Sequence, residues 1–160
     1  MLEMITGKME ICMWFDNKAE EAAKFYTTLF KDSHISAISR YGKEGFEFHR
    51  MPEGTALVVR FRINDLDIMA LNGGPRFTFN EAISIVVYCE TQDEIDYLWN
   101  GLTKDGQESQ CGWLKDKYGV SWQIVPTILA KLMSDPEKSS RVMKVFLQMK
   151  KFDIEKLLQA

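Results

Sequence analysis

The residues best suited to chemistry lie between Gln110 and Pro126, where two short apolar strands are expected on either side of the turn Lys115–Gly119. The second strand, Val120–Val125, carries Gln123 among apolar neighbours. A glutamine amide offers two donors and one acceptor, so it can orient a ligand, but it is a weak ligand for a transition metal. An unpaired buried amide costs about 1–3 kcal/mol, so Gln123 needs a partner in the protein or in a ligand.

Histidine and cysteine, the usual metal-binding and nucleophilic residues, are sparse. The two histidines, His34 and His49, fall on different expected strands or loops and are interpreted as surface residues. The three cysteines, Cys12, Cys89 and Cys111, are far apart and form no CxxC motif. Neither a zinc site nor a disulfide framework is indicated, and buried free thiols in a reducing cytosol are expected. The sequence thus predicts neither a metal nor a cofactor.

Glycine-rich turns that hold nucleotides or methyl donors are also missing. Gly73 and Gly74 are followed by Pro75 and a phenylalanine-rich loop rather than by a helix, and there is no G-x-G-x-x-G. G-x-S-x-G, H-E-x-x-H and P-loop motifs are absent as well. Methyl transfer by a doubly wound cofactor domain is therefore not expected.

Bulk composition points to an ordinary globular protein. The 160 residues are 46% hydrophobic and 27% charged, with a formal net charge of -3. This length fits one domain or two small fused modules. The acidic balance argues against nucleic-acid binding, which depends on clustered positive charge. The beginning, Met1–Met4, has no basic flank, and no stretch approaches a membrane span, so we expect a soluble cytoplasmic protein without a membrane partner.

Hydrophobic patterning predicts a strand, a helix and three further strands in the first half of the chain. The helix begins after Asp16 or Asn17 and ends near Phe30. The expected strands are Lys8–Phe15, Ile35–Tyr41, Ala56–Ile63 and Leu66–Leu71, with a short additional strand indicated at Phe46–Phe48.

The same order returns in the second half. Thr91 should cap a second helix that ends at Asp105-Gly106. The expected strands are Ala82–Cys89, Glu108–Leu114 and Val120–Val125. The apolar stripes of the two helices align, which indicates a weak internal repeat of pattern, although two amphipathic helices can also resemble each other by chance.

Helices are expected after Pro126. Thr127–Met133 is helix-like, and Ser134 with Pro136 forms a helix start signal. The apolar stripe that follows includes Val142 and Phe146, so this tail must cover its own sheet or a partner subunit.

A strand-helix-three-strand unit used twice resembles the vicinal oxygen chelate superfamily, which includes glyoxalase I, bleomycin-resistance proteins and extradiol dioxygenases. Several strings are similar to its PhnB-like branch, which is often labelled after a 3-demethylubiquinone 3-methyltransferase. The strings are Trp14-Phe15-Asp16 with Glu20-Glu21-Ala22 and Phe25-Tyr26, Met69 to Pro75, Phe79 to Ser84, and Gln110 to Gly119 with Ser121-Trp122-Gln123.

The resemblance implies an α+β fold in which two βαβββ modules form half-barrel mixed sheets around a cavity, followed by a C-terminal helical tail. Residues 1–160 would form a single glyoxalase/bleomycin-resistance-like domain. The first module would span 8–75, the second 76–126 and the tail 127–160. Because relatives are commonly dimers, a homodimer is expected.

In metal-dependent relatives, ligands come from the first and last strands of each module. The matching positions here are at or beside Ile11, near Ala70, near Ser84, and at Gln123. Ile and Ala have no donor atoms, and Ser and Gln are weak neutral donors. A one-residue slip would bring Glu10 to the first position, but the other positions offer no compensating carboxylate or imidazole. We therefore expect the metal site to be lost.

The resemblance also assigns residues to the cavity. Trp14 and Trp122 would lie under the helices, Gln110 and Trp113 at the rim, and the loop Arg76–Phe79 would act as a lid. The expected ligand-binding residues are Ile11, Met13, Ala70, Asn72, Ser84, Tyr88, Gln110, Trp113 and Gln123. Such a mixture of apolar walls, amides and hydroxyls is typical of an organic-ligand site, although these side chains could also simply fill the barrel.

Three functions follow from these expectations. The first is binding of a small organic molecule without metal. The alternative is a lyase, isomerase or oxygenase-type enzyme of the glyoxalase superfamily with an atypical site, for which Tyr88 is the only candidate acid-base group in the cavity. The third is an interaction role built on dimerisation, which is compatible with either of the others.

Overall fold

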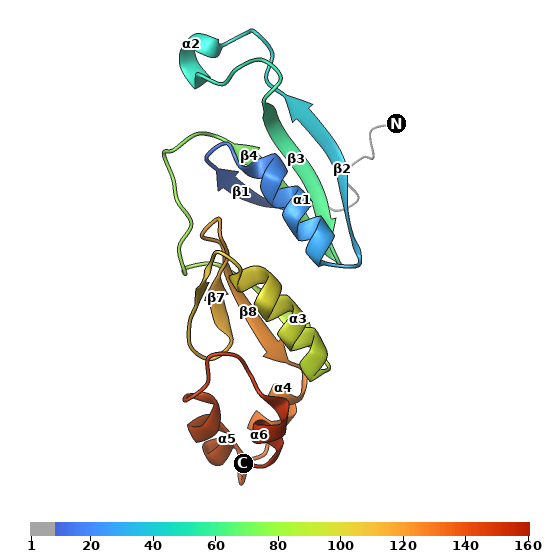
Figure 1. Ribbon diagram of the computed structural model, residues 1–160, viewed down its shortest axis with the longest axis vertical. Helices are drawn as coiled ribbons and strands as arrows, with labels where there is room; N and C mark the ends of the chain where they lie inside the picture. Colours follow the sequence, from blue (N-terminus) through green and yellow to red (C-terminus); the bar gives the residue numbers. More distant parts are fainter. Residues whose placement is uncertain (1–8) are drawn as a thin grey trace. The chain divides into compact units, whose positions relative to one another are not determined.

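The structure is a computed structural model, and it describes residues 9–160. The chain forms two compact units that divide between Thr78 and Phe79, and each is described by itself (Figure 1). Lys8, the first residue of the expected opening strand, lies outside the described residues.

The first unit has the expected strand-helix-three-strand order. Its elements are β1 (Ile11–Phe15), α1 (Ala19–Leu29), β2 (Ser33–Arg40), α2 (Phe46–His49), β3 (Ala56–Ile63) and β4 (Leu66–Asn72). The sheet order is β1-β4-β3-β2, with β1 parallel to β4 and the remaining pairs antiparallel. The mixed sheet and its helix are those of one βαβββ module.

The expected short strand at Phe46–Phe48 is wrong, because this segment is the helix α2. Gly45, with φ 79°, and Arg50, with φ 58°, bound the helix in the left-handed region. The Gly45 carbonyl accepts from the His49 amide at 3.1 Å, and the Phe46 carbonyl accepts from the Arg50 amide at 2.9 Å. Local hydrogen bonds therefore satisfy this segment without a partner strand.

α1 covers one face of the first sheet, and Asn72 fixes its start. The Tyr26 ring stacks on Phe61 at 6.0 Å between centroids. Asn72 Oδ1 accepts from the Ala19 amide at 2.9 Å, and Asn72 Nδ2 donates to the Ala56 carbonyl at 2.9 Å. Because Lys18, the residue before the helix, provides no side-chain cap, the amide of Asn72 supplies an acceptor for the exposed helix start.

Orientation of the first sheet is the reverse of the expected one. Met13, Ala70 and Asn72 lie on the face that α1 covers, and all three are buried. Ile11 pairs with Ile68 in the same register but is 42% exposed at the beginning of β1. Trp14, which was expected under the helix, lies on the opposite face.

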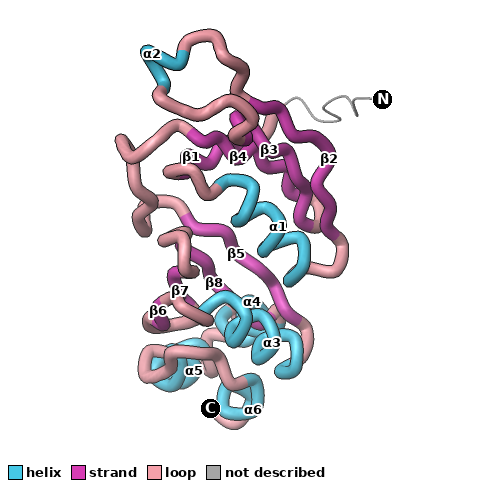
Figure 2. The backbone as a smooth tube through the Cα atoms, turned by 45° about the horizontal axis from the view of Figure 1, so that its top comes forward, coloured by secondary structure: helices cyan, strands magenta, loops and turns pink. Residues whose placement is uncertain are grey.

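The second unit repeats the module and adds the tail. Its elements are β5 (Ser84–Cys89), α3 (Gln92–Thr103), β6 (Gln107–Glu108), β7 (Trp113–Lys115), β8 (Ser121–Pro126), α4 (Ile128–Met133), α5 (Ser139–Phe146) and α6 (Ile154–Leu158). The sheet order is β5-β8-β7-β6. Figure 2 shows α3 lying along the sheet and α4–α6 gathered at the end of the chain.

One detail of the second sheet differs from expectation. The single strand expected at Glu108–Leu114 is divided into β6 and β7, because Cys111 and Gly112 both have positive φ, 56° and 80°. A Cβ atom on Gly112 would lie 2.5 Å from the Phe152 ring and 2.7 Å from the Ile124 carbonyl oxygen. This position therefore needs glycine for its backbone and for the close approach of the tail.

α3 begins at a capping box and covers one face of this sheet. Thr91 Oγ1 accepts from the Glu94 amide at 3.2 Å, and the Glu94 carboxylate accepts from the Thr91 amide at 3.2 Å. The covered face contains Leu114, Trp122 and Ile124, which are at most 1% exposed. Trp122 thus lies in the core, as the sequence predicts.

The β7–β8 turn depends on Asp116, which is only 3% exposed. Asp116 Oδ1 accepts from the amides of Tyr118, at 2.9 Å, and Val120, at 3.1 Å. Its Oδ2 accepts from the Trp122 indole at 2.8 Å. One carboxylate thus holds both the turn and the first core residue of β8.

The tail packs on its own unit. Val142, Phe152 and Leu157 are buried. The amides of Cys111 and Gly112 donate to the carbonyls of Met149 and Lys150 at 2.8 and 2.7 Å. These three side chains are therefore covered within their own unit. The helix predicted to start at Ser134 and Pro136 starts later: this segment forms turns, and α5 begins at Ser139.

Gln92 ties α3 to the tail. Its Nε2 donates to the Phe152 carbonyl at 3.0 Å, and its Oε1 accepts from the Ile154 amide at 2.9 Å. One side chain at the start of α3 therefore satisfies backbone groups at the start of α6.

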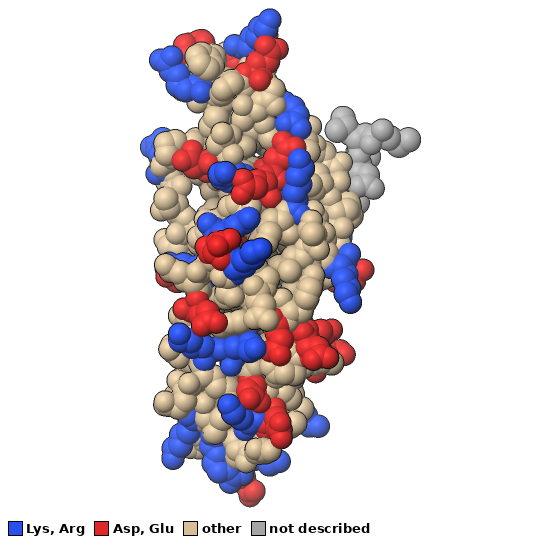
Figure 3. All heavy atoms as spheres, in the orientation of Figure 1, with Lys and Arg blue, Asp and Glu red and all other residues tan. Residues whose placement is uncertain are grey.

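Charged side chains of both signs are interspersed on the face of each unit drawn in Figure 3. Over residues 9–160, no helix combines the length and apolar character needed to cross a membrane.

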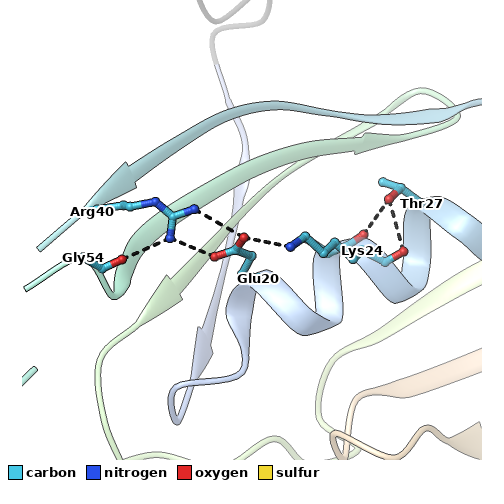
Figure 4. Close-up of polar contacts among 6 residues, drawn as sticks. Glu20, Lys24, Thr27, Arg40 and Gly54 are labelled. Atoms are coloured by element: carbon cyan, nitrogen blue, oxygen red, sulfur yellow. Dashed lines mark hydrogen bonds and ion pairs between the residues drawn. The ribbon is translucent and has the colours of Figure 1, made fainter. Parts of the chain in front are cut away.

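One of these charged groups joins α1 to β2. The Glu20 carboxylate accepts from Lys24 Nζ at 2.9 Å and from the Arg40 guanidinium at 2.9 and 3.3 Å (Figure 4). Arg40 also donates to the Gly54 carbonyl at 3.1 Å. The hydrogen bonds from Arg40 and then from Lys24 lower the pKa of Glu20 from its ordinary 4.5 to about 2.

Glu20→Gln tests this network. Because the pKa of Glu20 is lower in the folded state, its stabilisation is present above pH 4.5 and is lost as the pH falls towards 2. We expect the variant to lose less than about 1 kcal/mol at pH 7, since the group is partly exposed, and to match the wild type near pH 2. Urea unfolding at several pH values measures this; Glu21→Gln, a neighbour paired with Lys18, is the control. A loss that is independent of pH would contradict the assignment.

Asp116→Asn tests the turn. The amide keeps one acceptor oxygen but presents a donor to Trp122, so we expect the free energy of unfolding to fall by about 2–3 kcal/mol. Urea unfolding followed by tryptophan fluorescence measures the change. Asp65→Asn, at the fully exposed turn between β3 and β4, should have little effect. Equal losses in the two variants would show that Asp116 has no special role.

Candidate functional site

The candidate site lies on the face of the second sheet opposite α3, which we call the open face. Side chains alternate along each strand, so those beside the buried Trp122 and Ile124 point away from α3. The open face carries Trp113 and Lys115 from β7, Ser121 and Gln123 from β8, and Ser84, Val86 and Tyr88 from β5.

The strand register arranges these residues in rows. Gln123 pairs with Trp113 on one side and with Val86 on the other. Ser121 pairs with Lys115 and Ser84 in the next row. Because directly paired residues have Cβ atoms about 4.5–5.5 Å apart, a single small molecule can touch both rows.

Gln123 makes one hydrogen bond on this face. Its Nε2 donates to Ser84 Oγ at 2.9 Å, which leaves the Ser84 hydroxyl hydrogen available. Within the described part of the chain, Gln123 Oε1 accepts no hydrogen bond. The pair therefore presents an acceptor and a donor side by side, next to the Trp113 ring.

A groove of about 410 Å³ is lined by Trp113 and Ser121, the strand partners of Gln123 and Ser84, whereas Gln123 and Ser84 themselves do not line it. Gln110, Trp113, Lys115 and Ser121 contribute to its walls, with Glu81 from the loop before β5. Its volume falls within the range of small-molecule pockets. Glu81 binds Lys115 Nζ at 2.5 Å, and the ammonium lowers the pKa of the Glu81 carboxyl.

The expected site residues are thus distributed differently. Ser84, Tyr88, Trp113 and Gln123 share the open face, and Gln110 lines the groove beside it. Tyr88 is 68% exposed at the far end of β5. The buried trio Met13, Ala70 and Asn72 belongs instead to the core under α1.

Lys115 and Glu81 were not among the expected site residues. Period-two alternation from Trp113 could have placed Lys115 on the open face. Glu81 lies in a loop without periodicity, so nothing in the local pattern could have indicated its contact with Lys115.

The loop after β4 packs on its own unit. The Trp14 indole donates to the Gly74 carbonyl at 2.9 Å, and its ring meets Phe77 edge to face with centroids 5.0 Å apart. A Cβ atom on Gly73 would lie 2.2 Å from the Trp14 ring. Phe77, which was expected in a lid, is thus held against Trp14.

A divalent metal does not fit the donors present. Glu10, the one carboxylate near a ligand position, is paired with Arg60 at 3.1 Å. On the open face, the corresponding groups are the hydroxyl of Ser84 and the amide of Gln123. Among residues 9–160, no three His, Cys, Asp or Glu side chains form a group that could hold a metal ion.

The thiols offer no evident nucleophile. Cys12 is exposed, not buried as expected; its partial burial, followed by the negative charge of nearby Glu10, raises the pKa of its thiol. Burial likewise raises the pKa of Cys89 to about 11. Both thiols therefore stay protonated at neutral pH, which makes them poor nucleophiles.

Comparisons with known proteins agree with this architecture. The family model for 3-demethylubiquinone-9 3-methyltransferase matches residues 7–125. A PhnB protein of known structure from Bacillus cereus is 38% identical, with a TM-score of 0.68. The match covers 76% of this chain and 100% of the Bacillus cereus chain. No curated protein matches.

More distant structures show the same fold. The fosfomycin resistance protein FosX from Mesorhizobium loti is 14% identical with a TM-score of 0.54, and the match covers 82% of this chain and 100% of that one. FosX from Listeria monocytogenes is 14% identical with a TM-score of 0.52, covering 80% and 97%. With its two βαβββ units, the chain belongs to the PhnB-like 3-demethylubiquinone-9 3-methyltransferase family and has the glyoxalase-like fold.

Proposed function

We propose that this protein binds a small organic molecule on the open face of the second sheet, without the divalent metal used by many relatives. The observation that carries the proposal is the Ser84–Gln123 pair beside Trp113. Its free amide oxygen and hydroxyl hydrogen form a polar contact point beside Trp113 and Val86, the two strand partners of Gln123. Few polar groups within apolar walls are typical of ligand sites.

The expected ligand has a flat apolar body and a neutral polar group. The Trp113 ring can stack on the body. The Ser84–Gln123 pair can bind a group that both donates and accepts a hydrogen bond, such as an amide or a hydroxyl. A ligand that fails to pair with Gln123 would leave its amide desolvated, which gives the site selectivity.

Methyl transfer, which the family's description suggests, has no support in the residues of this face. Fold alone does not specify a reaction. Ser84 and Gln123 orient ligands through neutral hydrogen bonds, and neither is a strong acid or base at neutral pH. Binding is therefore the function that the geometry favours.

Trp113→Ala and Gln123→Ala test the location of the site. A thermal-shift screen of aromatic amides and alcohols selects a ligand, and calorimetry then measures its affinity. We expect Trp113→Ala to weaken binding about tenfold or more, since about 1.4 kcal/mol of stacking would be lost, and Gln123→Ala to weaken it by several-fold. Tyr97→Ala, which removes an aromatic ring on α3 outside the site, is the control and should bind normally.

Metal independence is measured in the same assay. Affinity should be unchanged after dialysis against EDTA. Loss of binding on chelation and its recovery with a divalent ion would contradict the proposal, as would normal binding by both site variants.

A further inference from the structure

Two chemically different side chains stand next to each other along β7. Trp113 and Lys115 are two residues apart, so they point to the same face of the sheet about 6.6 Å apart. Both line the 410 Å³ groove. An aromatic surface and an ammonium group at this spacing match an aromatic ring that carries a carboxylate on a single methylene group.

The two partners of the Lys115–Glu81 ion pair differ in how firmly the fold holds them. Lys115 lies on a strand paired on both sides and its side chain is 32% exposed, whereas Glu81 comes from a loop and is 62% exposed. Lys115 Nζ carries three donors, and Glu81 is its one partner within residues 9–160. Because exposed ion pairs contribute little, another carboxylate can replace that of Glu81 at small cost.

The second acidic residue of the groove is already engaged. Glu108 Oε1 accepts from the Trp99 indole at 2.8 Å, and its Oε2 lies 3.7 Å from Lys150 Nζ. It is therefore not poised to bind a cationic ligand. The charge that is fixed in place, and whose partner is exchangeable, is the ammonium of Lys115.

From this arrangement we infer that the groove takes an aromatic carboxylate. The ring of the ligand stacks on Trp113 and its carboxylate binds Lys115. Without ligand, the Glu81 carboxylate pairs with Lys115, and the ligand carboxylate replaces it on binding. This inference rests on the proposed binding function and adds two specificity residues to it: Lys115 selects the acid, and Glu81 competes with it. The Ser84–Gln123 pair remains available for a polar substituent on the ring.

A matched pair of ligands tests the inference. 2-Naphthylacetate and 2-naphthylacetamide share ring and size and differ in the charge of one group. Binding is measured by calorimetry and by quenching of tryptophan fluorescence. We expect the acid to bind about threefold or more tightly than the amide at low salt, and Lys115→Gln to abolish that difference.

Glu81→Gln supplies the opposite change on an exposed loop, where it does not endanger folding. Affinity for the acid should rise about two- to fivefold, while affinity for the amide stays constant. Glu108→Gln makes the same charge change in the same groove and should leave the preference unaltered; an equal gain there would show a general charge effect and overturn the displacement. Lys117→Gln is the control for Lys115, because Lys117 lies over the Tyr118 ring in the neighbouring turn.

The outcomes separate the two proposals. If acid and amide bind equally to the wild type, or if Lys115→Gln retains the preference, the inference falls while the binding function stands. If neither compound binds but another compound of the thermal-shift screen does, the inference falls and the binding function stands; if no compound of the screen binds, both fall.

Discussion

The second unit depends on a single buried carboxylate. Asp116 accepts hydrogen bonds from two turn amides and from the Trp122 indole, and so fixes where β8 begins relative to β7. A slip of one residue would exchange the two faces of the strand. With Trp122 held under α3, Gln123 must point outward, opposite Trp113. The interaction that secures the core therefore also sets the chemistry of the open face.

Much of this architecture could be predicted from local sequence. The alternation of Ala56–Ile63, the capping box at Thr91 and the turn before β8 all act through near neighbours, so their signals are local. Which side chains of β1 lie under α1 could not be predicted in the same way. Ile11–Phe15 is apolar at every position, so the strand shows no alternation that would distinguish its two faces. Asn72 shows a second reason: its role is to cap a helix 53 residues away, which only the folded sheet makes evident. The same reason applies to the metal-ligand positions that the resemblance assigned to the first unit, because the sequence does not show which face of β1 they occupy.

The open face illustrates that the residues placed on a fold, and not the fold itself, set what a site can bind. In the glyoxalase-like fold the sheet provides paired positions on neighbouring strands, and the residues at those positions decide what binds. Here they are a hydroxyl and a neutral amide, with an aromatic ring and an exchangeable ion pair nearby. Neutral hydrogen-bonding groups orient organic ligands, whereas carboxylates and imidazoles would be needed to hold a transition metal. Membership of a family described as methyltransferases therefore does not determine the function of this chain.

The central claim is that ligand binds on the open face of the second sheet. The four tryptophans make this directly measurable, since each indole N–H gives its own signal in a ¹H–¹⁵N correlation spectrum. Trp122 and Trp99 are held in the second unit by carboxylates, Trp14 is held in the first unit, and Trp113 stands on the open face. On titration with 2-naphthylacetate, the Trp113 indole and the Gln123 side-chain amide should shift together and saturate, while the Trp122 signal stays in place. A saturating ligand that leaves both Trp113 and Gln123 unmoved would contradict the claim.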